Sequence, residues 1–364
     1  MYGFEPSDEQ RMLMDAAERY AANQLRAAGR EADEAGEFPQ ELIEKGWELG
    51  VLQASVPEAY GGFGERSAVT GALAAEAMAW GDLSGTLAVM APTSYVMPIL
   101  LGGTEEQKKA LIPPVIEADW KPYVAAFVEP SFDFYEGEMQ TTAQAKKGKY
   151  LLSGEKAYVP FAEQAPAFLV FTMLDGALRA FNVPSDAPGL SVGEREALLG
   201  IHALPTYRLK LDDVTLDEDA LIGGEGEFDA GEVIASTQVA IAAMAIGLST
   251  GALDYALPYA KEREVWGVPI AQKQSIAFML AEMAIEIESN RLLVWEAAWK
   301  LDEGDPDAAR AAYLALSGAA DTAMMVTDRA VQTFGGHGYV REHPVEMWMR
   351  NGRGIPVMPG LAMV

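Results

Sequence analysis

The chain has 364 residues and contains no cysteine. Disulfides, thiolate metal sites and cysteine nucleophiles are therefore excluded together, and an intracellular location is favoured. Histidine is almost as scarce. Only three are present, and they are too dispersed in the sequence to predict a metal site: His202, His337 and His343.

Positive charge is the second shortage. Lysine and arginine number 27 against 54 aspartates and glutamates, which gives a net charge of −27. Phosphate backbones are bound through clusters of lysine and arginine, and no such cluster stands out, so we expect no nucleic-acid partner.

Targeting and membrane-spanning signals are also missing. Residues 1–20 carry acids and look like a capped helix, without the basic and apolar regions of a signal peptide. No apolar run is expected to approach the roughly 20 residues that a membrane helix needs. We therefore expect a cytoplasmic protein that has no membrane span.

The last fifteen residues, from Arg350 to Val364, lack aspartate and glutamate altogether. Their sequence is RNGRGIPVMPGLAMV, and the last acid of the chain is Glu346. A carboxylate-free run of glycine, proline and methionine is unexpected in so acidic a chain. It raises the question of whether a functional acid is missing from it.

Apolar residues, by contrast, are plentiful and make up half of the chain, which is enough for a substantial core. The first third has the helical period, with Ser7 as a helix cap and Pro57–Gly64 as a break. From about Pro122 the period changes to two, which predicts short strands. The helical period then returns in Glu232 to Glu264 and in Ser275 to Leu301.

Strands and helices are thus segregated along the chain. This predicts an α+β fold and argues against a doubly wound nucleotide fold. Neither a GxGxxG motif nor a phosphate-binding GxxxxGK[ST] loop is found. We expect three domains that pack as one unit: a helical domain at 1–121, an antiparallel β domain at 122–225, and a second helical domain at 226–364.

The second helical domain carries the most specific motifs. Residues 259–299 and 330–353 resemble the C-terminal domain of the acyl-CoA dehydrogenases, and shorter matches follow that family's order and spacing along the whole chain: Pro57–Gly64, Gly103–Pro114, Val128–Pro130 and Gly154–Val159. The resemblance implies an N-terminal helical domain, a middle β-barrel or sandwich and a C-terminal four-helix bundle. It also implies FAD, shared between two subunits of a tetramer.

The family's chemistry is α,β-dehydrogenation of an acyl-CoA thioester. A glutamate removes the α-proton while the β-hydride passes to the flavin, and electrons normally continue to an electron-transfer flavoprotein. The α-proton is weakly acidic, so this reaction needs a positioned carboxylate and hydrogen bonds to the thioester carbonyl.

One half of the cofactor site is retained, and we call it the adenine side. Arg263 and Trp266 match the family's Arg-x-x-Phe, where the planar arginine suits the FAD pyrophosphate and an aromatic ring faces the adenine. The other matches are a glutamine that follows this motif and a Gln-x-x-Gly-Gly: Gln274, Gln332, Gly335 and Gly336. Alone, the arginine would be read as a solvated charge and the glycines as a turn, but their joint spacing favours cofactor binding.

The other half, which we call the flavin-ring side, is altered. The family's TEPxAGSD is replaced by VEPSFDFY after Phe127, so that Val128 replaces a threonine. The family's Trp-Ile-Thr is replaced by Tyr158, Val159 and Pro160. Proline offers neither a hydroxyl nor a backbone N–H to the flavin. Neutral drift is the alternative interpretation, since tyrosine can replace tryptophan as a stacking surface.

The catalytic base is absent from both positions that the family uses. Most members place a glutamate nine residues after the arginine that matches Arg350, and here that residue is Pro359. The minority position is Thr237, whose neutral hydroxyl cannot take a carbon-bound proton. Two other acids are candidates. Glu232 is also explained as a first-turn acid that the helix dipole favours, and Glu129, in the flavin-facing loop, is part of the ordinary family pattern.

Three hypotheses follow. The chain is the non-catalytic partner of an α2β2 acyl-CoA dehydrogenase, in which it completes the FAD site of a catalytic paralogue that acts on acyl-CoA, holds the tetramer together and is inactive alone. Alternatively, it is a self-sufficient FAD enzyme with a relocated base, or a flavin-free structural paralogue. The sequence does not identify the acyl chain, although a steroid-derived group is conceivable by analogy with heteromeric members, and it leaves open whether the oligomer is homomeric.

Overall fold

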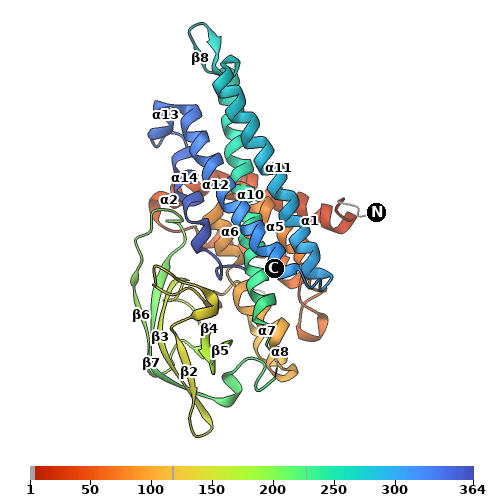
Figure 1. The fold of residues 1–364 in the computed structure, drawn as a ribbon, viewed down its shortest axis with the longest axis vertical. Helices are drawn as coiled ribbons and strands as arrows, with labels where there is room; N and C mark the ends of the chain where they lie inside the picture. The colour runs from red at the N-terminus through yellow and green to blue at the C-terminus, as the bar shows by residue number, and fades with distance from the viewer. Residues whose placement is uncertain (1–4, 117–118, 227) are drawn as a thin grey trace.

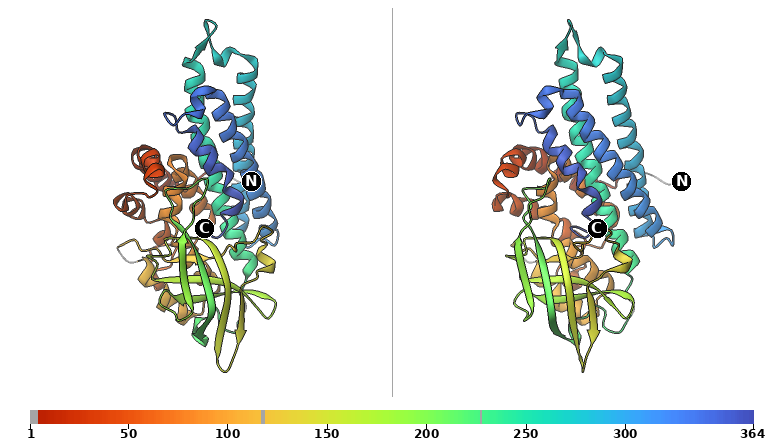
Figure 2. Two further views of the ribbon diagram at one scale, coloured as in Figure 1. Left: turned by 90° about the vertical axis from the view of Figure 1, so that its left-hand side faces the viewer. Right: turned by 60° about the vertical axis from the view of Figure 1, so that its left-hand side comes forward.

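The computed structural model describes residues 5–116, 119–226 and 228–364. Its three blocks follow the chain order: N-terminal helices, a β-sheet below them, and long C-terminal helices that rise away from the sheet (Figures 1 and 2). This mixed architecture of helix and sheet confirms the predicted fold class. Residues 1–4, the start of the stretch read as a capped helix without a signal peptide, lie outside the described residues.

The N-terminal block begins at the predicted cap. The Ser7 hydroxyl accepts a hydrogen bond from the Gln10 backbone, and the Gln10 side chain accepts one from the Ser7 N–H, which forms a capping box. The α-helices of this block are α1 (Asp8–Tyr20), α2 (Arg26–Ala35), α3 (Gln40–Trp47), α4 (Val51–Ala54), α5 (Ala68–Gly81), α6 (Leu83–Met90), α7 (Thr93–Gly102), α8 (Glu105–Leu111) and α9 (Pro113–Ile116).

The break predicted at Pro57–Gly64 lies between α4 and α5. Its glycines are required by close backbone contact, because a Cβ on Gly62 would lie 1.9 Å from the Val56 carbonyl oxygen and one on Gly64 would lie 2.0 Å from that of Ala54. Only glycine fits at these two positions.

The middle block is a seven-stranded sheet with the path β1-β4-β2-β3-β7-β6, and β5 also pairs with β4. Its strands are β1 (Val124–Ala126), β2 (Thr142–Ala145), β3 (Lys149–Pro160), β4 (Ala167–Leu174), β5 (Ala177–Pro184), β6 (Leu190–Arg195) and β7 (Thr206–Asp217). The prediction of an antiparallel sheet is wrong for two pairings, because β1 and β2 both run parallel to β4. Residues 127–141 leave the sheet between β1 and β2, and the chain rejoins β4 in the same direction.

A buried ion pair ties this excursion to β3. The Lys156 ammonium lies 2.9 Å from a Glu129 carboxylate oxygen and donates to the Phe127 carbonyl at 3.1 Å. Both side chains are almost fully buried. Burial lowers the pKa of Lys156 to about 8 and opposes ionisation of Glu129, but Lys156 and the Thr141 and Gln140 donors lower the pKa of Glu129.

The C-terminal block contains the helices α10 (Ala230–Glu262), α11 (Gln274–Asp302), α12 (Ala308–Phe334), α13 (Gly336–Tyr339) and α14 (Val345–Arg353), with the hairpin β8 (Glu264–Val265) and β9 (Val268–Pro269) between α10 and α11. The predicted long helices are confirmed within two residues at each end. Central α10 packs against α5, α11 and α12, and α14 packs on α12.

The expectation about apolar runs needs correction at α10. This helix is long and apolar enough to cross a membrane, but 89% of its most apolar stretch is buried inside the protein. The bent pair of α6 and α7 passes the same test together, and nearly all of its residues are buried as well. Both segments therefore have the surroundings of core helices.

Asp82 joins two of these core helices. It follows α5, and its carboxylate accepts the Gly85 N–H at 3.0 Å as the cap of α6. Burial raises the pKa of Asp82 to about 6 from an ordinary value of 3.8, although the cap hydrogen bonds oppose the shift. Between about pH 4 and pH 6 the folded protein thus holds this proton more tightly than the unfolded chain does, so the stability that Asp82 contributes falls as the pH rises.

We expect Asp82→Asn to remove this pH dependence while keeping a capping oxygen. The free energy of unfolding of the variant, relative to the wild type, should rise by about 2 kcal/mol between pH 4 and pH 7. Urea unfolding at several pH values measures the difference. A difference that stays constant with pH contradicts the raised pKa.

We expect Lys156→Met to lower the free energy of unfolding by about 3–5 kcal/mol, because it leaves the Glu129 carboxylate buried without its cation. The matched double variant Glu129→Gln/Lys156→Met should recover at least half of the loss, since it removes the charge and keeps an acceptor for the loop. A loss below about 1 kcal/mol in the single variant would show that the pair does not hold residues 127–141.

Candidate functional site

The end of the bundle farthest from the sheet carries Arg263 and Trp266. Helix α10 ends at Glu262, and Arg263 has an extended backbone that leads into β8. Trp266 and Gly267 form the hairpin turn, with φ values of 61° and 78°. This backbone matches the twist of a tight hairpin but is unusual for a tryptophan. Trp266 is 92% exposed at the tip (Figure 1).

These groups have no partners of their own within the described chain. The Arg263 guanidinium makes no ion pair or side-chain hydrogen bond among the described residues, and its backbone alone is bonded, to Tyr259 and Ile270. Gln274 is the exposed first residue of α11. The Arg263 guanidinium, the Trp266 indole and the Gln274 amide are therefore available to a ligand or another subunit at this end of the bundle.

The Gln332, Gly335 and Gly336 motif lies near the same end, where α12 stops. Gln332 is exposed, and Gly335 has φ 56° and ψ −128°, a conformation that favours glycine. A Cβ on either glycine would meet nothing within 4 Å. The open space over this backbone is what a group in close contact with the main chain requires.

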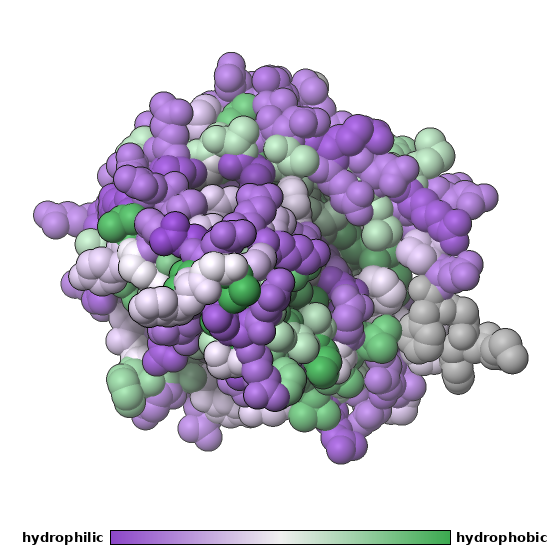
Figure 3. Space-filling view, turned by 90° about the horizontal axis from the view of Figure 1, so that it is seen from above, coloured by the Kyte–Doolittle hydropathy of each residue, from purple (hydrophilic) through white to green (hydrophobic). Residues whose placement is uncertain are grey.

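Aromatic residues attach this second element to α10. The Tyr259 and Phe334 rings stack with centroids 3.8 Å apart, and the Tyr259 hydroxyl lies 3.0 Å from His337 Nδ1. The structure thus brings all six residues of the adenine side to one end of the bundle. In the view down onto this end, apolar residues surface among mainly hydrophilic ones (Figure 3). These residues fit a dinucleotide, because they offer donors and open backbone that this chain leaves unused.

The flavin-ring side lies far from that end, because its residues belong to β3 and to the 127–141 excursion, and the sheet lies at the opposite end of the molecule from β8 (Figure 1). Phe127 and Val128 are 2% and 6% exposed, at the start of the 127–141 excursion. Phe127 packs edge-on against Phe134 and Phe171. Phe132 and Phe134 of the same loop are placed differently, since Phe134 contacts Phe127 and Phe132 is fully exposed.

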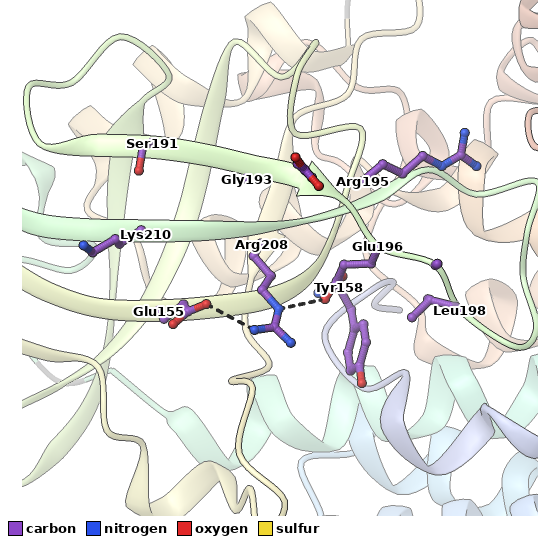
Figure 4. Close-up of a pocket in the computed structure, with 11 residues that line it drawn as sticks. Glu155, Tyr158, Ser191, Gly193, Arg195, Glu196, Leu198, Arg208 and Lys210 are labelled. Carbon is purple, nitrogen blue, oxygen red and sulfur yellow. Dashed lines mark hydrogen bonds and ion pairs between the residues drawn. The ribbon is translucent and has the colours of Figure 1, made fainter.

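Tyr158 occupies an irregular point of β3. The pairing of β3 with β7 shifts between Lys156 and Val159, and Tyr158 has φ 57°. Such a bulge re-aims a side chain, and the Tyr158 ring points away from the sheet toward the helices (Figure 4). Its backbone N–H already donates to Glu196 at 2.9 Å.

The remaining two residues of the flavin-ring side lie at the end of β3. Val159 and Pro160 are buried and pair with Tyr207 and Thr206 of β7. Proline has no N–H and no hydroxyl, so Pro160 cannot make the hydrogen bond toward the flavin ring that the family pattern places at this position. The flavin-ring side therefore does not fit the ring as the family pattern requires.

A cavity of about 600 Å³ opens beside Tyr158 on β3, β6 and β7 (Figure 4). It is lined by acids and bases together, and Arg208 lies 3.5 Å from Glu155 and 3.4 Å from Glu196. These charges largely compensate one another. The cavity lining includes Tyr158 but neither Thr237 nor Pro359.

The two base positions, by contrast, come together in the structure. The Thr237 hydroxyl accepts the Gly360 N–H at 2.6 Å and donates to the Ala362 carbonyl at 2.8 Å. A Cβ on Gly360 would lie 2.5 Å from that of Phe127, so Pro359 and Gly360 pass directly over the flavin-ring side. Neither Pro359 nor Thr237 provides a carboxylate at this point.

The acids that could substitute for the missing base already have partners. Glu232 lies 2.9 Å from the Arg66 guanidinium, and its N–H is capped by Asp229. Glu129 is held by Lys156. No group of three or more acidic or histidine side chains that could hold a metal is found in the part of the chain that the structure describes.

Four residues of this region carry no signal in the sequence. Arg66, Thr93 and Ser236 contact the last residues of the chain, and Glu196 binds the Tyr158 backbone. All four contacts join segments distant in sequence, so no local spacing indicates them. The ion pair of Lys156 was also not predicted, although this residue lies within the Gly154–Val159 match to the family.

Similarity to known proteins extends along the whole chain. The families described as acyl-CoA dehydrogenase N-terminal, middle and C-terminal domains match residues 7–119, 128–214 and 225–361. The mitochondrial short-chain specific acyl-CoA dehydrogenase of Bos taurus is 34% identical over 361 residues, which cover 97% of this chain and 87% of the relative.

Solved structures agree. Butyryl-CoA dehydrogenase from Megasphaera elsdenii is 31% identical, with a TM-score of 0.89 over 100% of this chain and 96% of its own. A structure described as the electron transferring flavoprotein of Acidaminococcus fermentans is 35% identical, with a TM-score of 0.89 over 99% of this chain and 96% of its own. The chain belongs to the acyl-CoA dehydrogenase family.

Proposed function

We propose that this chain is the non-catalytic partner subunit of a heteromeric acyl-CoA dehydrogenase. The observation that carries the proposal is the contrast between its two half-sites. On the adenine side the family residues are present: Arg263 and Trp266 have no side-chain partners in the described chain, and the backbone at Gly335 and Gly336 is open. On the flavin-ring side the base is missing, because Thr237 and Pro359 occupy both family positions.

Members of this family bind FAD, which supplies the acceptor for the substrate hydride. In the proposed complex, Arg263 would hold the pyrophosphate, the Trp266 ring would face the adenine, and the open backbone at Gly335 and Gly336 would admit the dinucleotide. The flavin ring and the acyl-CoA lie in a paralogous subunit that has the glutamate. No residue of this chain takes the α-proton.

An exposed apolar stripe supports an oligomer. Phe278, Ile285 and Leu292 follow one another at seven-residue spacing on α11 and are 59%, 60% and 48% exposed. Tyr313 and Leu314 on α12 are also exposed. A stripe of this kind is typical of a helix face that another subunit covers, and we propose a tetramer with two copies of each chain.

The alternative of a self-sufficient enzyme requires a free acid near Thr237, and Glu232, on the same helix, is paired with Arg66. We therefore favour the partner role. Its natural setting, in our proposal, is the cytoplasm, with an acyl-CoA substrate and an electron-transfer flavoprotein as acceptor. The acyl group is then chosen by the catalytic paralogue.

We expect the purified chain to show no acyl-CoA dehydrogenation with an artificial electron acceptor, and the complex with a glutamate-containing paralogue to turn over. The reason is the missing carboxylate at both base positions. Turnover by the lone chain would overturn the proposal, and a paralogue that is equally active without this chain would remove its role.

In the mixed complex, Arg263→Ala should weaken FAD binding about tenfold to hundredfold, because about 1.5–3 kcal/mol of charge-assisted hydrogen bonding is lost. Arg310→Ala is the matched control, since Arg310 is an exposed arginine near the opposite end of the bundle, at the start of α12. FAD retained after gel filtration gives the readout. Equal retention in the two variants contradicts the assigned role of Arg263.

A further inference from the structure

The last residues of the chain are buried, although they form no regular element. Residues 361–364, which we call the closing segment, are at most 4% exposed. They lie among α5, α7 and α10. A Cβ on Gly71 of α5 would lie 2.9 Å from the Val364 side chain, and Thr93 of α7 and Ser236 of α10 contact the segment from other sides.

Buried hydroxyls hold the backbone of this segment. Thr237 donates to the Ala362 carbonyl at 2.8 Å, Thr93 accepts the Met363 N–H at 2.9 Å, and Ser236 accepts the Val364 N–H at 3.1 Å. Ser236 also donates to the Val364 carbonyl. The hydroxyls are 3% exposed or less. The Met363 and Val364 amides are thus satisfied by side chains of other elements, as the amides of a bound peptide are.

A cation closes the far end of the segment. Arg66 donates to the Val364 carbonyl oxygen through two nitrogens, at 3.3 Å and 3.1 Å, and its third nitrogen pairs with Glu232 at 2.9 Å. The Arg66 side chain therefore holds the closing segment in place, and it also pairs with Glu232, the acid that could otherwise serve as a base.

The closing segment lies directly beside the two positions at which the family places its base. In the family's reaction the substrate α-carbon lies between the flavin ring and the base, and the corresponding positions in this chain are Phe127 and Thr237. The chain at Gly360 already fills that gap, with no room for a Cβ against Phe127. An acyl chain that extended past Thr237 would enter the volume that Leu361, Met363 and Val364 occupy.

We propose that the closing segment stands in the place of an acyl chain and so makes this subunit's own site reject acyl-CoA. Leu361 and Met363 are then specificity-determining residues, because they exclude the apolar ligand that the fold would otherwise accept. This inference rests on the proposed function, which assigns the substrate to the paralogue.

The test compares octanoyl-CoA with free CoA by calorimetric titration of the lone full chain. The ratio of the two dissociation constants isolates the contribution of the acyl chain. We expect a ratio near one for the wild type. Removal of residues 361–364, or the milder Leu361→Ala/Met363→Ala, should raise the ratio at least tenfold, because burying each methylene strengthens binding severalfold. Val357→Ala, at an exposed residue of the same region, should leave it unchanged.

Circular dichroism decides which variant is folded, and the double alanine variant serves if the truncated chain is not. A wild-type ratio of ten or more overturns the inference, as does a folded variant whose ratio stays near one. The proposed function fails separately. If the mixed complex holds no FAD while the ratios behave as expected, the closing segment excludes acyl-CoA but the partner role is wrong.

Discussion

The hydroxyl of Thr237 joins the last residues of the chain to the central helix, and the state of the site depends on this contact. It bonds both Gly360 and Ala362, and this places Pro359 and Gly360 against Phe127. A glutamate at Thr237 could not make this pair of bonds without a change of backbone. The residue that replaces the base at one family position therefore organises the segment that replaces it at the other.

The two half-sites lie at opposite ends of the C-terminal helices, and they differ in how far the rest of the chain surrounds them. The adenine side stands on the hairpin tip and at the end of α12, where Trp266 and Gly336 face no other part of the described chain. The flavin-ring side is built into the packed junction of sheet and helices. Residues at the tip can keep their partners in another subunit, whereas changes at the junction alter the chain's own core.

Periodicity was enough to predict the three blocks and the long helices, because a period of 3.6 or two reports directly which side chains are buried. Strand direction could not be predicted, since the parallel pairing of β1 and β2 with β4 depends on where a fifteen-residue excursion returns. Resemblance located Arg263 and Pro359, but not the contacts of Arg66, Thr93 or Ser236. Such contacts join residues up to 298 positions apart and leave no local pattern.

In the proposed mixed tetramer, only one combination of half-sites can hold FAD. The most direct measurement is the FAD content of the purified complex, from flavin absorbance and protein mass. If this chain supplies only the adenine side, we expect about one FAD for every two chains. About one FAD per chain would contradict it, because every flavin-ring side, including that formed by Tyr158 and Pro160, would then be functional.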